Sequence, residues 1–292
     1  MPNTRKPVVV GVDGSEASQH ALDWAVLEAQ LTGRSLRVLY SYTLAPGSAP
    51  TDKVLREIGH EVLDAANARV RARAPELVVE SDLHYGPPVS LLLEQSKEAA
   101  VLAVGSRGAG SFAALLLGSV AVGVTAHAHC PVVVVRGTQG APGNGEGSRV
   151  VVGVDGSEPS VAAVEFAIAG ASRRRLPLHA LSAWHLPPLY EPTMYPELLD
   201  PEIYETETRE ALSEELAGWR ERFPDVPITE VVEQSHPVEA LVRASQTADL
   251  VVVGCRGRGG FRGMLLGSVS QGVIRHADCP VAVVHAHQDA GE

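Results

Sequence analysis

Two glycine-rich segments with the same spacing contain the residues of this chain that are best suited to ligand chemistry. Each has two glycines three positions apart, then nine residues, then a Gly-Ser pair. Glycine lets a ligand approach the backbone closely, successive amides can form an anion-binding nest, and a serine hydroxyl adds a donor. We therefore expect a phosphate-binding loop in each segment. The residues are Gly105, Gly108, Gly118 and Ser119 in the first, and Gly254, Gly257, Gly267 and Ser268 in the second.

Two aspartates, Asp13 and Asp155, follow short valine-rich runs and precede Gly-Ser-Glu. Such a carboxylate could accept hydrogen bonds from ribose hydroxyls or an adenine amine. Taken alone, Asp-Gly-Ser is usually a turn, and Gly-Ser before a helix is usually an N-cap. The repetition of both patterns in one chain favours binding over these simpler interpretations.

Two commoner phosphate loops do not occur in the sequence. There is no Gly-x-x-x-x-Gly-Lys-Ser/Thr pattern, and no predicted strand is followed by Gly-x-Gly-x-x-Gly. A P-loop lysine and a dinucleotide fingerprint are therefore not indicated.

The chain is a duplication. Residues 7–16 return as 149–158, and residues 105–135 return as 254–284 with 19 of 31 positions identical. Gly137–Ser148 is glycine-rich and predicts a flexible linker. We expect two domains, 1–142 and 143–292, with the net insertion of the second copy in a proline-rich loop, Leu186–Glu202.

Each copy alternates short apolar runs with helical segments. In the first copy we expect strands at 7–12, 35–42, 77–84, 101–104 and 131–135, and helices at 15–32, 51–73, 87–99 and 119–128. This alternation predicts an α/β fold of two tandem Rossmann-like domains, each a doubly wound five-stranded parallel sheet flanked by helices. If strand four lies beside strand one, Asp13 and Gly105 meet at the reversal point where such sheets bind ligands.

With these motifs, nearly the whole chain resembles two tandem domains of the universal stress protein family, in its ATP-binding branch. That branch has the motif Gly-x-x-Gly-(nine residues)-Gly-Ser/Thr, and both copies match it. The resemblance implies that ATP is held through its phosphates by the eight loop residues named above. It also implies that Asp13 and Asp155 hold the adenosine end, that the backbone near Ser41 and Ala183 meets the adenine, and that Mg²⁺ accompanies the triphosphate.

The resemblance further implies association through the last strands, Val132–Arg136 and Val281–His285, either within one chain or as a homodimer. The two sites are expected to be similar but unequal. Ser270 replaces Ala121 after the Gly-Ser pair, where a hydroxyl could reach a terminal phosphate, and Cys255 replaces Ser106. We interpret Cys255 as either an acidic, redox-sensitive thiol or, the simpler view, a small packing residue.

Other titratable groups have simpler interpretations. Arg107 and Arg256 share one loop position and either neutralise phosphate or remain solvated. His127, His129 and Cys130 have metal-ligand spacing, but the second copy keeps it only in part, so we expect no metal site. Three cysteines do not suggest a disulfide framework.

Composition excludes other classes of function. The net charge is −11 and aromatic residues make up 4%, so nucleic-acid binding is not expected. The one basic run, Arg173–Arg175, falls where a helix should end, and cations there offset the helix dipole. No run of about 18 apolar residues predicts a membrane helix, and the N-terminus lacks a signal-peptide pattern, so we expect a cytoplasmic protein.

The sequence thus favours an ATP-binding protein of stress response or growth-arrest signalling, whose nucleotide occupancy tunes conformation or partners. No catalytic residue is apparent, although slow ATP hydrolysis is left open. The alternatives are an ATP-using enzyme on an adenine-nucleotide α-hydrolase-like fold and a nucleotide-free dimerisation protein. The sequence does not distinguish ATP from ADP or a cyclic nucleotide, nor does it identify the stress or the partner.

Overall fold

The structure is a computed structural model that describes residues 5–44, 51–108, 117–136, 148–185, 201–258 and 265–286. By their contacts, residues divide into two compact units, Met1–Pro142 with Asp278–Val283, and Gly143–Ala277 with Val284–Glu292. Most of the expected linker and of the proline-rich loop lies outside the described residues. Pro201 and Glu202, which we expected at the end of that loop, instead begin a helix.

Nine elements of the first copy follow the expected alternation of strands and helices. They are β1 (Val8–Gly11), α1 (Glu16–Thr32), β2 (Leu36–Tyr42), α2 (Asp52–Arg73), β3 (Val79–Tyr85), α3 (Pro88–Ser96), β4 (Val101–Gly105), α4 (Ser119–His127) and β5 (Val132–Val135).

The second copy repeats the same order of elements. They are β6 (Val150–Gly153), α5 (Glu158–Arg174), β7 (Leu178–Trp184), α6 (Pro201–Arg222), β8 (Ile228–Gln234), α7 (Pro237–Ser245), β9 (Leu250–Gly254), α8 (Ser268–His276) and β10 (Val281–Val284).

The strand order confirms the predicted reversal point. In the first copy the order is β3-β2-β1-β4-β5, and in the second it is β8-β7-β6-β9-β10. All pairs of the first group run parallel, with Val8 opposite both Leu36 and Val101, and so do β6–β7, β6–β9 and β7–β8 in the second. The last strand, β10, also pairs antiparallel with β5, and most of it therefore groups with the first unit. The predicted α/β, Rossmann-like architecture is correct.

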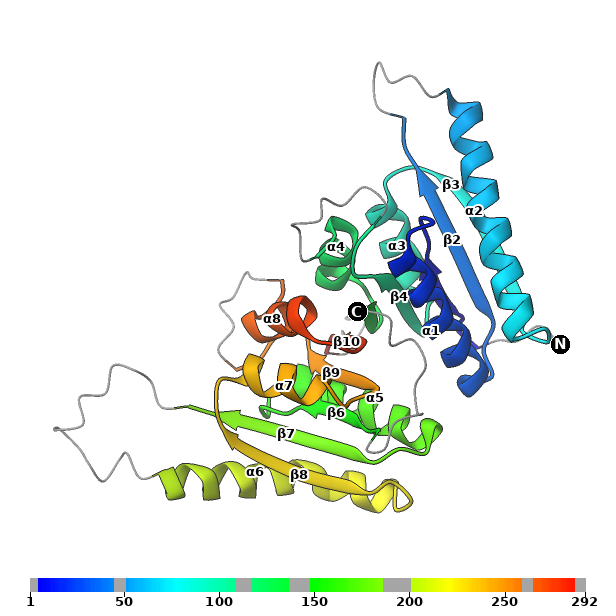
Figure 1. Ribbon diagram of the computed structural model, residues 1–292. Coiled ribbons are helices and arrows are strands. Elements are labelled where there is room, and N and C mark those ends of the chain that lie inside the picture. The colour runs from blue at the N-terminus through cyan, green and yellow to red at the C-terminus, as the bar shows by residue number, and fades with distance from the viewer. Residues whose placement is uncertain are drawn as a thin grey trace, which may run out of the picture. The chain divides into compact units, whose positions relative to one another are not determined.

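Helices cover both faces of each sheet (Figure 1). In the first copy α1 and α2 pack together on one face, and α3 and α4 pack together on the other. In the second copy α5 with α6 and α7 with α8 repeat this arrangement. Because both faces are covered, the central strands are apolar throughout, and Val8, Val9 and Val10 are fully buried.

Helix α1 begins and ends as its sequence predicts. Ser15 is the N-cap and accepts a hydrogen bond from the backbone N–H of Ser18, while Gly33 ends the helix in the left-handed region at φ 62°. In α5 the matching N-cap is Ser157, but the residue that ends the helix, at φ 56°, is Arg175. The basic run therefore does lie at a helix end.

Two expected boundaries differ from the structure for local reasons. Helix α3 ends at Ser96 and not at Ala99, because the N–H groups of Lys97 and Glu98 bond to carbonyls only three residues back. Strand β3 begins at Val79 and not at Leu77, because the N–H of Leu77 closes a turn with the carbonyl of Ala74.

Candidate functional site

A cavity of about 530 Å³ lies at the carboxyl ends of β1, β2 and β4 in the first unit. This is where the strand order reverses, the usual position of a ligand in an open α/β sheet. Every residue expected to bind the ligand in this copy lines it. These residues are Asp13, Ser41, Gly105, Gly108, Gly118 and Ser119.

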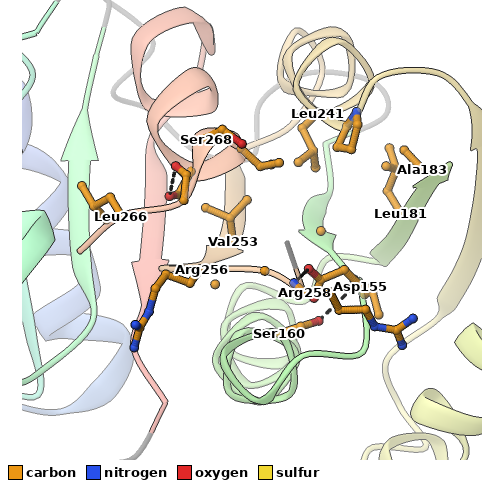
Figure 2. A pocket seen from close by; sticks show the side chains of 18 residues that line it. Asp155, Ser160, Leu181, Ala183, Leu241, Val253, Arg256, Arg258, Leu266 and Ser268 are labelled. Carbon is orange, nitrogen blue, oxygen red and sulfur yellow. Dashed lines mark hydrogen bonds between the residues drawn. The ribbon is translucent and has the colours of Figure 1, made fainter. Parts of the chain in front are cut away.

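The second unit has a corresponding cavity of about 290 Å³ (Figure 2). It again brings all of the expected residues together from the ends of β6, β7 and β9 and the start of α8. These residues are Asp155, Ala183, Gly254, Gly257, Gly267 and Ser268.

One wall of each cavity is apolar. In the first unit it is formed by leucines of β2 and α3 and by Val104 of β4, and in the second by their counterparts. An apolar wall of this kind suits a flat ring system such as a purine. A few polar groups of the protein then suffice to fix the orientation of the ring. The wall residues are Leu39, Leu91, Leu92 and Val104, and Leu181, Leu241 and Val253.

The opposite end of each cavity is the N-terminus of a helix whose N-cap has no side chain. Gly118 caps α4 and Gly267 caps α8, both in extended conformation, and neither helix receives a capping side-chain hydrogen bond. By contrast, α1 and α5 are capped by the hydroxyls of Ser15 and Ser157. The first-turn N–H groups of α4 and α8 are therefore available to an anion, which the helix dipole also favours.

The glycines of each motif are required for two different reasons. A Cβ at Gly105 would lie 2.7 Å from the carbonyl carbon of Ala17, and one at Gly254 would lie 2.9 Å from that of Pro159. Here glycine lets helix α1 or α5 pass close to the loop. A Cβ at Gly108 would likewise overlap the carboxylate of Asp13, and a Cβ at Gly257 that of Asp155. Four motif glycines are thus explained by packing within the protein.

Gly118 is not explained in this way. A Cβ there would lie 3.5 Å from both Arg107 Cα and the Ser106 carbonyl oxygen, which is ordinary contact, and its φ of −74° suits any residue. At Gly267 the nearest atom, Arg256 Cα, would lie at 3.3 Å. The fold alone does not demand glycine at Gly118, whereas close approach of a ligand to the backbone would.

The two aspartates fix the turn after the first strand of each copy. Asp13 Oδ1 accepts hydrogen bonds from the N–H of Ser15 at 3.0 Å and from its hydroxyl at 2.5 Å, and Asp155 does the same with Ser157. The Ser15 hydroxyl also lies 3.5 Å from the Arg107 carbonyl oxygen. One carboxylate oxygen of each aspartate is therefore engaged in holding the turn against the glycine loop.

The end of β2 contributes a phenol that sequence reasoning missed. Tyr40 lines the first cavity, and its pKa is raised by burial and then by the charge of Asp13. The hydroxyl of the neighbouring Ser41 bonds to the Gly86 carbonyl. In the second copy the position of Tyr40 is Ser182. The sequence did contain an indication of this residue, because Tyr40 is a polar aromatic directly before Ser41 in a chain with few aromatics.

Ser270 lines the second cavity and also supports the loop. Its side chain is buried, and its hydroxyl lies 3.0 Å from the Cys255 carbonyl oxygen and 2.9 Å from that of Gly267. The hydroxyl thus bonds the first turn of α8 to the glycine loop. Ala121 leaves the first copy without this bond.

The remaining candidates act locally. Arg107 and Arg256 are exposed cavity residues without an ion pair among the described residues, and Arg256 extends away from Asp155 (Figure 2). Cys255 is buried in the loop. Burial raises the pKa of the Cys130 thiol to about 12.

The histidines near Cys130 make backbone contacts. The His127 ring bonds to the Gly123 carbonyl, and the N–H of His129 donates to the Ser96 hydroxyl. Within the described residues, no group of three or more His, Cys, Asp or Glu residues is arranged to hold a metal. Among the same residues, none of the helices combines the length and apolar character that a membrane crossing requires.

Comparison with known proteins identifies the family. The model of the universal stress protein family matches residues 4–136 and 147–285. A universal stress protein of Mycobacterium tuberculosis strain H37Rv is 38% identical over 299 residues, covering 96% of this chain and 97% of that protein.

A solved structure with nearly full coverage supports the fold, and a second is similar over part of the chain. A universal stress protein from Archaeoglobus fulgidus DSM 4304 has a TM-score of 0.71 at 23% identity, covering 98% of both chains. A universal stress protein solved in complex with cAMP is 28% identical with a TM-score of 0.37, covering 46% of this chain and 99% of that chain. The protein described here, with two matches to the family model in one chain, belongs to the universal stress protein family as a tandem member.

Proposed function

We propose that each of the two domains, 1–142 and 143–292, binds one ATP molecule, and that ATP occupancy is the signal the protein carries. The observation that supports this most is the pairing, in one cavity, of an apolar wall with an uncapped helix N-terminus. A purine suits the first and a phosphate the second. Both features occur twice in one chain.

Each expected residue takes a part in this proposal. The loop from Gly105 to Gly108 and the amides at Gly118 and Ser119 receive the phosphates, as Gly254, Gly257, Gly267 and Ser268 do in the second domain. The strand ends at Ser41 and Ala183 face the adenine. Asp13 and Asp155 hold the adenosine end through their carboxylates, whose Oδ1 atoms also hold the turn at Ser15 and Ser157.

Magnesium fits the proposal only as a companion of the triphosphate. Among the described residues that line the cavities, the carboxylates are Asp13 and Asp155, and both lie on the strand side of the site and not in the helix turn that receives phosphate. Mg²⁺ is usually held by one or two carboxylates together with substrate phosphates. When bound, the ion would neutralise phosphate charge, while the helix amides orient the same oxygens.

We propose further that the protein acts in the cytoplasm, in stress response or growth-arrest signalling. A change in ATP occupancy alters its conformation or its association with partners, which include a second copy of this chain in a homodimer. Its relatives are universal stress proteins by name, which supports the role without identifying the stress.

Calorimetry on nucleotide-stripped protein tests the proposal. We expect ATP to bind with two sites per chain, and mass spectrometry of the small molecule released from freshly purified protein to identify the nucleotide. ADP and cAMP serve as competitors. Absence of nucleotide binding would refute the proposal in favour of a nucleotide-free dimerisation protein, and rapid turnover of a second substrate with ATP would favour an enzyme.

Substitutions at the uncapped helix ends assign the sites. Gly118→Val should remove one ATP site, because the side chain obstructs approach to the α4 amides, and Gly267→Val should remove the other. Gly218→Val on α6 is the matched control, since no atom lies within 4 Å of a Cβ built there. Unchanged stoichiometry in the double variant would show that these helix ends do not hold the ligand.

A further inference from the structure

The turn that follows the first strand of each copy is covered by different residues in the two units. Gly14 and Gly156 occupy the turn at φ 83° and 70°. In the first unit Val62 of α2 lies over it, with Cγ2 3.2 Å from a Cβ built on Gly14. In the second unit the guanidinium of Arg258 lies there, with Cζ 3.0 Å from a Cβ built on Gly156.

Arg258 is anchored to the candidate site by its own backbone. Its N–H donates to Asp155 Oδ2 at 3.1 Å, and the residue lines the second cavity (Figure 2). The residue is exposed. Its side chain thus places an exposed cation at the edge of the site.

Glu215 of α6 is a second carboxylate near this cation. Its side chain is half-buried, and Oε1 lies 3.5 Å from the hydroxyl of Ser160, which also lines the cavity. Burial and the charge of Asp155 raise the pKa of Glu215, and the charge of Arg258 opposes that rise. The guanidinium thus acts on Glu215 through its charge and not through a direct ion pair in the described part of the chain, while the Arg258 backbone bonds to Asp155.

The first copy has no such pair. At an offset of 149 residues, Arg258 corresponds to Ala109 and Glu215 to Ala66. Ala66 is buried in the packing of α2. Among the described residues that line the two cavities, Arg258 is the charge that the second site adds, because Arg256 and Arg107 place the same charge on both loops, as Asp155 and Asp13 do.

We propose that Arg258 determines the specificity of the second site, by adding a cation that favours highly charged nucleotides and that Glu215 restrains. This inference rests on the proposed function. The ligand phosphate and the Glu215 carboxylate compete for the Arg258 guanidinium. Removing Arg258 should therefore weaken ATP binding, whereas removing the charge of Glu215 should strengthen it. The first site, with a valine over its turn, discriminates less by charge.

The test isolates the second site with Gly118→Val and measures ATP and AMP binding by calorimetry. Because a charge-assisted hydrogen bond contributes about 1.5–3 kcal/mol, Arg258→Ala should weaken ATP binding about tenfold and AMP binding clearly less. Glu215→Gln should tighten ATP binding severalfold. High salt should reduce the difference between wild type and Arg258→Ala.

A matched gain of function uses the other site. In the Gly267→Val background, Ala109→Arg should increase the preference of the first site for ATP over AMP. Circular dichroism confirms that each variant is folded.

The outcomes separate the two proposals. If Gly118→Val protein binds no nucleotide at all, the proposed function fails at the second site. If it binds ATP but Arg258→Ala and Glu215→Gln both weaken ATP and AMP equally, Arg258 only supports the loop, and the specificity inference is wrong.

Discussion

The two units share the elements that form the site and differ in the contacts that support those elements. The glycine spacing, the aspartate turn and the glycine N-caps of α4 and α8 are the same in both. The contact between the first two helices, α1 with α2 and α5 with α6, differs between the units. In the first unit Asp23 of α1 is buried and forms ion pairs with Arg69 and Arg73 of α2, each at 2.6 Å.

In the described part of the second unit the counterpart is weaker, Glu165 with Arg222 at 3.9 Å, and both side chains are largely exposed. The comparison indicates that the geometry required by a ligand was kept after duplication, while helix packing found separate solutions. Four tests, taken in order of expected effect, examine that view.

The largest effect should come from alanine at the first motif glycine, and it should be equal in the two units. Gly105→Ala and Gly254→Ala each drive a Cβ into the backbone of the neighbouring helix, so we expect each to cost about 3 kcal/mol of unfolding free energy. Chemical denaturation measures this. A large loss in one unit and none in the other would contradict the equivalence of the two loops.

The helix contact should distinguish the units. Asp23→Asn removes the charge that binds two arginines from a buried position, and we expect a loss of about 2 kcal/mol. Glu165→Gln, at an exposed pair, should change stability by less than about 0.5 kcal/mol. Hydrogen exchange of α1 and α5 measures the stability of each unit separately. Equal losses of stability in the two variants would show that the two helix contacts do not differ in strength.

The ends of α1 and α5 offer an exchange of residues. Both terminal residues are left-handed, but Gly33 is suited to that conformation and Arg175 is not. Arg175→Gly should stabilise the second unit by about 1 kcal/mol, and Gly33→Ala should destabilise the first by a similar amount. Thermal unfolding checks both signs, and a loss of stability in Arg175→Gly would mean that its side chain makes a compensating contact.

The smallest effect concerns the pH dependence of the second unit. The pKa of Glu215 is raised in the folded state, so its ionisation costs native stability as the pH rises through the unfolded pKa to above the folded pKa. Glu215→Gln should therefore unfold at a slightly higher temperature than wild type near pH 7. The difference should vanish near pH 3, and a difference independent of pH would indicate a packing effect.

Local patterns predicted most of the fold and the positions of the candidate site. Apolar runs, the capping serine at Ser15 and the ending glycine at Gly33 located the elements to within about three residues. The strand order was an assumption, that strand four lies beside strand one, and the structure confirms it. All twelve expected site residues line the two cavities because strand ends converge at the reversal point.

What could not be predicted depends on packing between distant segments. The cover of the turn by Val62 or Arg258, and the bond from Ser270 to the glycine loop, require the rotamers and helix positions of a folded chain. Periodicity indicates which face of a helix is buried, but not which side chain on a neighbouring segment meets it. The phenol of Tyr40 was missed for the same reason.

The glycine at the start of α4 also bears on how this protein can be improved or can evolve. A Cβ at Gly118 would fit without strain, and serine is a better N-cap than glycine by a few tenths of a kcal/mol. Selection for thermostability alone would therefore replace it. Engineering by consensus or by stability score should leave this position untouched, and a relative that carries serine here would be expected to have exchanged ligand binding for robustness.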